Sequence, residues 1–356
     1  MKKQKYLEIY EKLKEEIIRG DYQYADKLPS KRTIADDNMV SVITVQHAYS
    51  LLCDEGYVEA RERSGYFVIY KKEDFIGDIE RKEPAELRAN SEDLHSVDEI
   101  SYNSIVKTMR KVMLDYGERI LVKPPNAGCV ELRSEIQKHL AVSRGIRVGI
   151  DQIIIGAGAE YLYSLVAQLF KKEGLIAVEC PSYEKIAKVY ESWGHRVDYL
   201  ELGMEGILSS ELKRTKAKIL HVTPFHSFPS NITASISKKN EYLQWAKEGR
   251  IIIEDNYDSE LTVSRKVEDA LFALDEGKNV IYINTFSKTI APSIRMGYMI
   301  LPEKLLKRYE DELGFYSCTA PVFEQYVIAE LLRSGDYQRH INRVRRRRRQ
   351  SIGTIS

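Results

Sequence analysis

Short apolar runs rich in β-branched residues recur through the chain after residue 150, and stretches with helical patterning separate them. The runs lie around Ile153, Ala177, Ile219, Ile251 and Ile281. Runs of this length are typical of buried strands, and strands that alternate with helices are typical of a parallel sheet covered by helices. We therefore predict an α/β fold for this part of the chain. Because such sheets bind ligands at the carboxyl ends of their strands, the residues that follow each run are the candidates for a site.

The run that begins at Val280 leads into a polar turn that contains Lys288, and Arg295 follows seven residues later. Lysines at strand ends are mostly solvated surface charges. A lysine that follows a buried strand can instead have a partly desolvated amine, which suits it to Schiff-base chemistry. We expect Lys288 to be such a residue, and two further stretches favour this interpretation.

The run Arg250 to Ile253 ends in acidic residues, and strand periodicity directs Asp255 and Tyr257 to the same side. This pair suits a pyridine ring. A carboxylate beside the ring nitrogen keeps it protonated and makes the ring an electron sink, while a phenol can hydrogen-bond a ring oxygen. Tyr183 follows another strand and can stack on a flat heterocycle.

The strand around Ile153 is followed by small residues and then by an apolar helix. Backbone N–H groups at such a helix start can bind an anion, here through Gly158, Ala159 and Glu160. The guanidinium of Arg295 can pair with a phosphate in a bidentate manner, and nearby hydroxyls can complete the site. We predict that these hydroxyls belong to Thr285 and Ser287.

The first 70 residues carry a different pattern. An amphipathic stretch from Tyr6 to Arg19 predicts one helix, Ser30 can cap a second over Lys31 to Asp37, and Ser41 can cap a third that ends before Gly56. Two short strands follow, around Tyr57 and around Phe67. Three helices and a β-hairpin predict a winged helix-turn-helix, whose third helix enters the major groove of DNA.

Taken in order, these stretches resemble the MocR-type regulators of the GntR family. Three motifs carry the resemblance in addition to the winged helix, namely Thr223 to Asn231, Ile253 to Glu260 and Thr285 to Tyr298. The resemblance implies a GntR-type domain over residues 1–70, a linker over 71–95 and an aminotransferase-like domain over 96–356. It implies that this last domain has the fold of the large domain of fold-type-I transferases, with a mixed, mostly parallel sheet.

Pyridoxal 5'-phosphate is the cofactor that the resemblance implies, with Lys288 as its Schiff-base residue. The implied cofactor-binding residues are the ones that the residue chemistry selects: Gly158, Ala159, Glu160, Tyr183, Asp255, Tyr257, Thr285, Ser287, Lys288 and Arg295. No metal is expected. His226 matches a histidine that faces the site in the family, although a structural histidine is an equal alternative.

The resemblance also implies DNA contacts in the N-terminal domain. The residues concerned are Lys31, Arg32, Ser41, Thr44, His47, Arg63, Ser64 and Gly65. This chain departs from many relatives at Val42 and Ile43, where they carry a basic or polar pair. The alternative is a winged helix that binds protein instead of DNA.

In relatives, a C-terminal subdomain of roughly a hundred residues, about one small domain, follows the helix that here contains Arg345 to Arg349. The sequence is expected to lack it and to be truncated at the C-terminus. That subdomain supplies the arginine that binds the substrate's carboxylate and closes the site against water, so its absence argues against productive transamination. The five arginines are typical of a solvated helix face or tail.

The function predicted is therefore a DNA-binding transcriptional regulator whose aminotransferase-like domain senses an amine or amino-acid effector. Its expected partners are operator DNA, the effector and a second copy of the chain, because twofold half-sites require two DNA-binding domains. An active aminotransferase is one alternative. A plain DNA-binding repressor with a decayed, cofactor-free domain is the other.

Composition limits the remaining classes. The chain has 54 Lys and Arg against 53 Asp and Glu, a net charge of +1, which excludes a polycationic nucleic-acid binder. Its four cysteines have neither metal-ligand spacing nor a disulfide pattern, and we expect a reducing cytoplasm. No apolar run is long enough to span a bilayer, so no membrane association is expected.

Overall fold

The computed structural model describes residues 5–61, 64–71, 100–247, 249–262 and 269–353. Its contacts divide the chain into two units, residues 1–89 and 90–356, and each unit is described by itself. Nearly all of the predicted linker, residues 72–95, lies outside the described residues.

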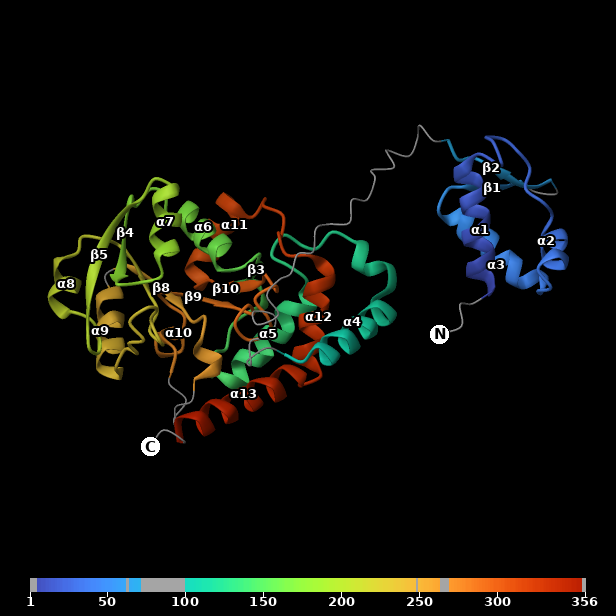
Figure 1. Ribbon diagram of the computed structural model, residues 1–356. Helices are drawn as coiled ribbons and strands as arrows, with labels where there is room; N and C mark the ends of the chain where they lie inside the picture. Colours follow the sequence, from blue (N-terminus) through green and yellow to red (C-terminus); the bar gives the residue numbers. More distant parts are fainter. Residues whose placement is uncertain (1–4, 62–63, 72–99, 248, 263–268, 354–356) are drawn as a thin grey trace. The chain divides into compact units, whose positions relative to one another are not determined.

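The N-terminal unit contains three helices and a two-stranded antiparallel hairpin (Figure 1). The elements are α1 (Lys5–Arg19), α2 (Lys31–Asp37), α3 (Val42–Asp54), β1 (Val58–Arg61) and β2 (Gly65–Val68). The apolar stripe of α1, with Ile9, Leu13 and Ile17, is buried with the inner face of α3. This arrangement confirms the predicted winged helix-turn-helix.

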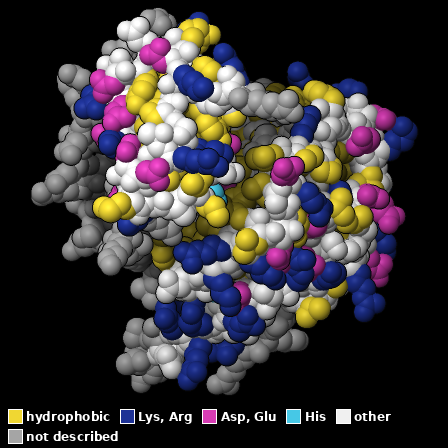
Figure 2. All heavy atoms as spheres, turned by 90° about the vertical axis from the view of Figure 1, so that its right-hand side faces the viewer, with side chains coloured by type: hydrophobic (Ala, Val, Ile, Leu, Met, Phe, Trp, Pro, Cys, Tyr) yellow, Lys and Arg dark blue, Asp and Glu magenta, His cyan; other side chains and the backbone are white. Residues whose placement is uncertain are grey.

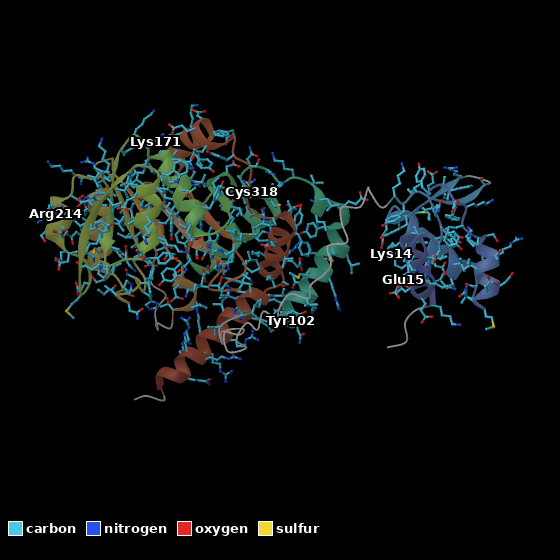
Figure 3. All side chains as sticks on the ribbon, turned by 45° about the horizontal axis from the view of Figure 1, so that its top comes forward. Lys14, Glu15, Tyr102, Lys171, Arg214 and Cys318 are labelled. Atoms are coloured by element: carbon cyan, nitrogen blue, oxygen red, sulfur yellow. The ribbon has the colours of Figure 1, made fainter. Side chains whose placement is uncertain are left out.

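Both predicted caps are present in this unit. The hydroxyl of Ser30 accepts a hydrogen bond from the Thr33 N–H, and that of Ser41 accepts one from the Thr44 N–H. Lys14, labelled on α1 in Figure 3, donates from Nζ to Oε2 of Glu55 at 2.7 Å. Because Glu55 is the residue that ends α3, this ion pair joins the two helices that share the core.

The second unit is built on an eight-stranded sheet with the order β3-β10-β9-β8-β7-β4-β5-β6. The strands are β3 (Ile153–Gly156), β4 (Leu175–Cys180), β5 (Arg196–Gly203), β6 (Gly206–Ile207), β7 (Ile219–Val222), β8 (Ile251–Asp255), β9 (Val280–Thr285) and β10 (Gly297–Ile300). The strands from β9 to β5 are parallel, β10 is antiparallel to both of its neighbours, and β6 is antiparallel to β5. The predicted mixed, mostly parallel sheet is confirmed.

Helices cover both faces of this sheet (Figure 1). The helices are α4 (Tyr102–Tyr116), α5 (Val130–Ser143), α6 (Ala159–Leu169), α7 (Glu184–Ser192), α8 (Ser209–Arg214), α9 (Ile236–Ala246), α10 (Leu271–Leu274), α11 (Glu303–Leu313), α12 (Val322–Arg333) and α13 (Asp336–Gly353), with short 3-10 turns at Gly117–Leu121, Ile150–Gln152 and Ser259–Leu261. Successive strand residues point to opposite faces. Accordingly Ile253 packs with α6, α7 and α11, whereas Ile252 packs with α5, α9, α10 and α12.

Strand β8 carries two carboxyl groups in succession, Glu254 and Asp255, and both are buried. The two oxygens of Glu254 accept hydrogen bonds from the N–H groups of Leu271 and Phe272, each at 2.8 Å. These are N–H groups of the first turn of α10, which have no partner within the helix. Glu254 therefore joins β8 to α10 on one face of the sheet, and Asp255 points to the other.

Replacing Glu254 by Ala is expected to destabilise this unit by about 3 kcal/mol, because two buried N–H groups lose their acceptors. Urea unfolding followed by tryptophan fluorescence measures this unit, since both tryptophans, Trp193 and Trp245, lie in it. The matched control is Asp311→Ala, which removes an exposed carboxylate paired with Lys307 and is expected to cost less than about 1 kcal/mol. Equal losses in both variants would contradict the assignment of Glu254.

Candidate functional site

A cavity of about 330 Å³ opens at the carboxyl ends of the central strands in the second unit. Its lining residues come from several loops and helix starts: Ala159, Glu160, Tyr163, Tyr183, Ile186, Thr223, Phe228, Asp255, Tyr257, Thr285, Ser287, Lys288 and Arg295. All of the predicted cofactor-binding residues except Gly158 are among them. Gly158 lies next to the guanidinium of Arg295, which lines the cavity.

Gly158 precedes α6 and adopts a φ of +90°. A Cβ at this position would lie 3.0 Å from Nη2 of Arg295, so both the backbone conformation and the space favour glycine. Nη1 of Arg295 lies 3.5 Å from the hydroxyl of Ser287. This end of the cavity thus combines a helix N-terminus, a guanidinium and hydroxyl groups, a donor set that fits a phosphate.

Glu160 adds a carboxylate to the same end of the cavity. Its Oε2 lies 2.7 Å from Nη2 of Arg295, and its Oε1 accepts from Nζ of Lys185 at 3.1 Å. Partial burial raises the pKa of Glu160, but hydrogen bonds, including that from Lys185, and the charge of Arg295 outweigh it and lower the pKa below the usual value. Glu160 therefore competes with any bound anion for Arg295, which its sequence position alone did not indicate.

Asp255, the last residue of β8, lines the same cavity. Its Oδ2 accepts a hydrogen bond from the hydroxyl of Tyr163, and its Oδ1 accepts one from the Tyr257 N–H at 3.2 Å. Nε2 of His221 lies 3.9 Å from Oδ2, and its Nδ1 is 2.7 Å from the hydroxyl of Tyr190. These neighbours fix the carboxyl group, which suits it to contact a ring nitrogen in a single orientation.

Tyr257 lines the cavity beside Asp255, and its hydroxyl donates to the backbone oxygen of His226 at 2.9 Å. Burial raises the pKa of Tyr257 to about 12, which keeps the phenol protonated and able to donate. The rings of Tyr183 and Phe228, at the rim, meet edge to face with centroids 6.5 Å apart. The cavity lining therefore combines exposed aromatic rings with the polar groups of Asp255 and Tyr257.

Lys288 lies on the turn that follows β9 and faces the cavity. Its side chain is exposed, so the expectation of a partly desolvated amine is wrong for this structure. Strand β9 ends at Thr285, and Lys288 lies three residues beyond it on a turn whose neighbouring residues Thr289 and Ile290 are buried. Its position next to the cavity still leaves the amine accessible to a bound aldehyde.

Two arginines of the predicted solvated run instead contact the loop that follows Tyr257. Nε of Arg345 donates to the backbone oxygen of Glu260 at 2.7 Å, and Nη1 of Arg348 lies 3.8 Å from Oδ1 of Asp258. The other oxygen of Asp258 is 3.3 Å from Nδ1 of His226. Helix α13 is thereby connected to the segment that carries Tyr257.

The outer side of α13 presents the exposed residues Arg346, Arg347 and Arg349. In Figure 2, Lys and Arg side chains gather at the lower end of the face that is drawn. The predicted solvated helix face is thus correct for part of this arginine run.

Sequence reasoning missed several residues of the cavity and of its support. Tyr163 lies four residues after Ala159 on α6, so helix periodicity could have placed it on the same face. Glu179 is buried at the end of β4 and accepts from the hydroxyl of Ser227 at 2.5 Å. This bond joins the segment before Tyr183 to the segment that carries Phe228, a tertiary contact with no local sequence signal.

In the N-terminal unit, the residues predicted to contact DNA lie on α2, on α3 and at the hairpin. Arg32 and His47 are exposed, and Lys31 is half-buried. The ring of His47 packs edge to face against Tyr6 of α1 at 5.6 Å. Arg63 lies outside the described residues.

At the hairpin, Ser64 is exposed and Gly65 has a φ of +117°. A Cβ on Gly65 would lie 3.0 Å from Cε of Lys27, so this turn approaches the segment before α2 closely. Ser41 and Thr44 are both at the start of α3, where their hydroxyl oxygens are 2.8 Å apart.

Within the described residues, no group of three His, Cys, Asp or Glu side chains could hold a metal ion. None of the helices in the described ranges is long and apolar enough to cross a membrane.

Both units match known families. Residues 5–68 match the bacterial regulatory proteins of the gntR family, and residues 93–353 match aminotransferase class I and II. The chain is 34% identical over 351 residues to the HTH-type transcriptional regulator YdeL of Bacillus subtilis, with 96% of this chain and 76% of YdeL covered. It is 27% identical over 359 residues to the HTH-type pyridoxine biosynthesis transcriptional regulator PdxR of Corynebacterium glutamicum, covering 97% of this chain and 77% of PdxR.

Among solved structures, kynurenine aminotransferase of Pyrococcus horikoshii is similar to this chain with a TM-score of 0.63 and 25% identity. The match covers 77% of this chain and 74% of that enzyme.

The buried carboxyl group of Glu179 is expected to make stability depend on pH. Burial raises its pKa from 4.5 to about 7. The folded chain therefore keeps a proton that the unfolded chain loses, so this contribution is complete below about pH 4.5 and is lost as the pH rises through about 7. The loss is on the order of 3 kcal/mol.

Glu179→Gln keeps an acceptor for Ser227 but cannot titrate. Urea unfolding of both proteins at about pH 5 and about pH 8 should show the wild type losing stability relative to the variant. All other titrating groups are shared by the two proteins and cancel in the difference. A stability difference that is the same at both pH values would refute the role given to this carboxyl group.

Proposed function

The chain belongs to the MocR-type group of gntR-family transcriptional regulators, in which a winged helix-turn-helix precedes an aminotransferase class I and II domain, and we propose that this second domain binds pyridoxal 5'-phosphate to sense an amine or amino acid. The observation that carries the proposal is the convergence of Lys288, Arg295 and Asp255 on one cavity of about 330 Å³. Asp255 ends β8, and Lys288 and Arg295 lie between β9 and β10. Each of the three suits one part of the cofactor. The bound cofactor would supply an aldehyde and a ring that withdraws electrons.

The residues that line the cavity have two proposed roles, binding of the phosphate and binding of the ring. The N–H groups at the start of α6, the hydroxyls of Thr285 and Ser287 and the guanidinium of Arg295 would bind the phosphate. Asp255, fixed by Tyr163, would contact the ring nitrogen. The hydroxyl of Tyr257 would exchange its hydrogen bond to the backbone oxygen of His226 for one to the ring oxygen.

Lys288 would form the covalent bond to the cofactor's aldehyde carbon. An effector with a primary amine would compete with Lys288 for that carbon. Its side chain would then lie near the aromatic rim formed by Tyr183 and Phe228. Differential binding of the effector to two conformations is what would alter DNA occupancy.

We further propose that the regulator acts as a homodimer. Large apolar side chains are exposed on α4 and just after it, namely Met113, Leu114, Leu121 and Val122. Exposed apolar patches of this kind favour a protein partner, and a twofold dimer matches two operator half-sites.

The first test is the visible absorption of the purified protein with pyridoxal phosphate. We expect the band of the lysine-bound cofactor in wild type and its absence in Lys288→Ala, because only this lysine lines the cavity within the described residues. Lys185→Ala is the matched control, since its amine lies close to the cavity at Glu160 yet should leave the band unchanged.

The same preparation separates the remaining alternatives. A band together with turnover of an amino donor and a keto acid would favour an active aminotransferase, as the solved relatives are. No band in any protein would leave a DNA-binding regulator without this cofactor and would refute the sensor proposal.

Glu160→Gln is expected to tighten phosphate binding at the same site, because it removes a negative charge that pairs with Arg295. We expect a roughly three- to tenfold lower Kd for pyridoxal phosphate, the order of one screened repulsion between charges. Equilibrium titration by absorption measures this. The control is Glu184→Gln, an exposed carboxylate paired with Lys188 on α7, and weaker binding by Glu160→Gln would show that Glu160 instead positions Arg295.

A further inference from the structure

The first turn of α3 presents apolar side chains where a DNA-reading helix usually presents polar ones. Ile43 is 72% exposed and Val42 is 41% exposed. Met39, in the turn before the helix, is 87% exposed. None of these three contributes to the core of the unit, to which α3 supplies Val45, Ala48, Tyr49 and Leu52.

The polar residues of the same turn are already engaged. The hydroxyl of Ser41 accepts from the Thr44 N–H at 3.1 Å, and the Ser41 and Thr44 hydroxyl oxygens are 2.8 Å apart. This arrangement is the cap that starts the helix. The two hydroxyls are therefore oriented by the helix start, and Val42 and Ile43 are exposed between them in the sequence.

Basic residues lie on the elements that precede and follow α3 in the chain. Arg32 is exposed on α2, and Nζ of Lys31 lies 3.4 Å from Oε1 of Gln46. Arg61 on the hairpin stacks over Phe67 and pairs with Glu59. Positive charges beside an apolar tip match a groove whose edges are phosphates and whose floor offers base edges.

The major groove of DNA has one apolar group, the 5-methyl group of thymine. Resting on the DNA-binding role of this domain, we infer that Val42 and Ile43 bind thymine methyl groups, and that each operator half-site has thymine where the first turn of α3 enters the groove. Polar base edges at that position would lose water without gaining a hydrogen bond. The apolar pair thus favours thymine by contact with its methyl group and disfavours the other bases, whose polar edges would lose water.

The test begins with selection of sites from random duplex DNA by the full chain. Each thymine of the selected site is then replaced by deoxyuridine, which removes one methyl group and keeps the base pairing. We expect the affinity to fall about fourfold for each buried methyl group, at one or two positions in each half-site. Replacement of the other thymines should leave the affinity unchanged.

A matched set of variants assigns the effect to these side chains. Ile43→Ala and Val42→Ala should bind the selected site more weakly and should no longer distinguish thymine from deoxyuridine at the sensitive positions. Ile18→Ala is the control, because Ile18 is 38% exposed on α1 and lies outside the reading turn. Ile43 is exposed, so its replacement should leave the thermal unfolding of the domain unchanged.

The outcomes are distinct. Selective DNA binding that is indifferent to every methyl group, or a deoxyuridine effect that persists in both variants, would overturn this inference and leave the regulator role intact. Unchanged affinity of Ile43→Ala would overturn it too, because Ile43 would then contribute nothing to DNA binding. Failure to select any DNA would overturn the inference together with the DNA-binding role.

Discussion

Strand β8 places the carboxyl groups of two consecutive residues in the interior, and each requires hydrogen-bond donors there. Glu254 accepts from N–H groups of the first turn of α10, and Asp255 accepts from the hydroxyl of Tyr163 and the backbone N–H of Tyr257. A buried carboxyl group without donors is strongly unfavourable, so these bonds set where α10, α6 and the segment after β8 can lie. The geometry of the cavity follows from satisfying the two carboxyl groups on opposite faces of one strand.

The sequence predicted the parts of the site that depend on local pattern. Runs of β-branched residues indicate buried strands, and the carboxyl ends of parallel strands meet at one edge of the sheet. Asp255, Thr285 and Arg295 could therefore be placed near the helix start at Ala159. Tyr163 and Glu179 were missed because their roles arise only when α6 lies over β8 and when β4 lies beside the segment with Ser227. Such contacts between distant segments leave no periodic signal.

Two expectations failed or changed for related reasons. The amine of Lys288 was expected to be partly desolvated. Strand β9 ends three residues before it, and the side chain of Lys288 is exposed on the turn that follows. All five arginines from Arg345 to Arg349 were expected to be solvated, yet Arg345 and Arg348 contact the loop after Tyr257. In both cases the sequence identified the side chains concerned. How far each side chain is buried depends on where its helix or strand ends and on what that element packs against.

The loop after Tyr257 makes contacts on two sides. From the interior, the buried carboxylate of Glu260 faces His139 and Arg144. Burial raises the pKa of Glu260, but the hydrogen bond with His139 and the charges of Arg144 and Arg345 outweigh it and lower the pKa to about 2. From the exterior, α13 contacts Asp258 and the backbone oxygens of Glu260 and Leu261. Because α13 also supplies Tyr337, Ile341 and Val344 to the core, a displacement of this helix would disturb the core and the segment that carries Tyr257 together.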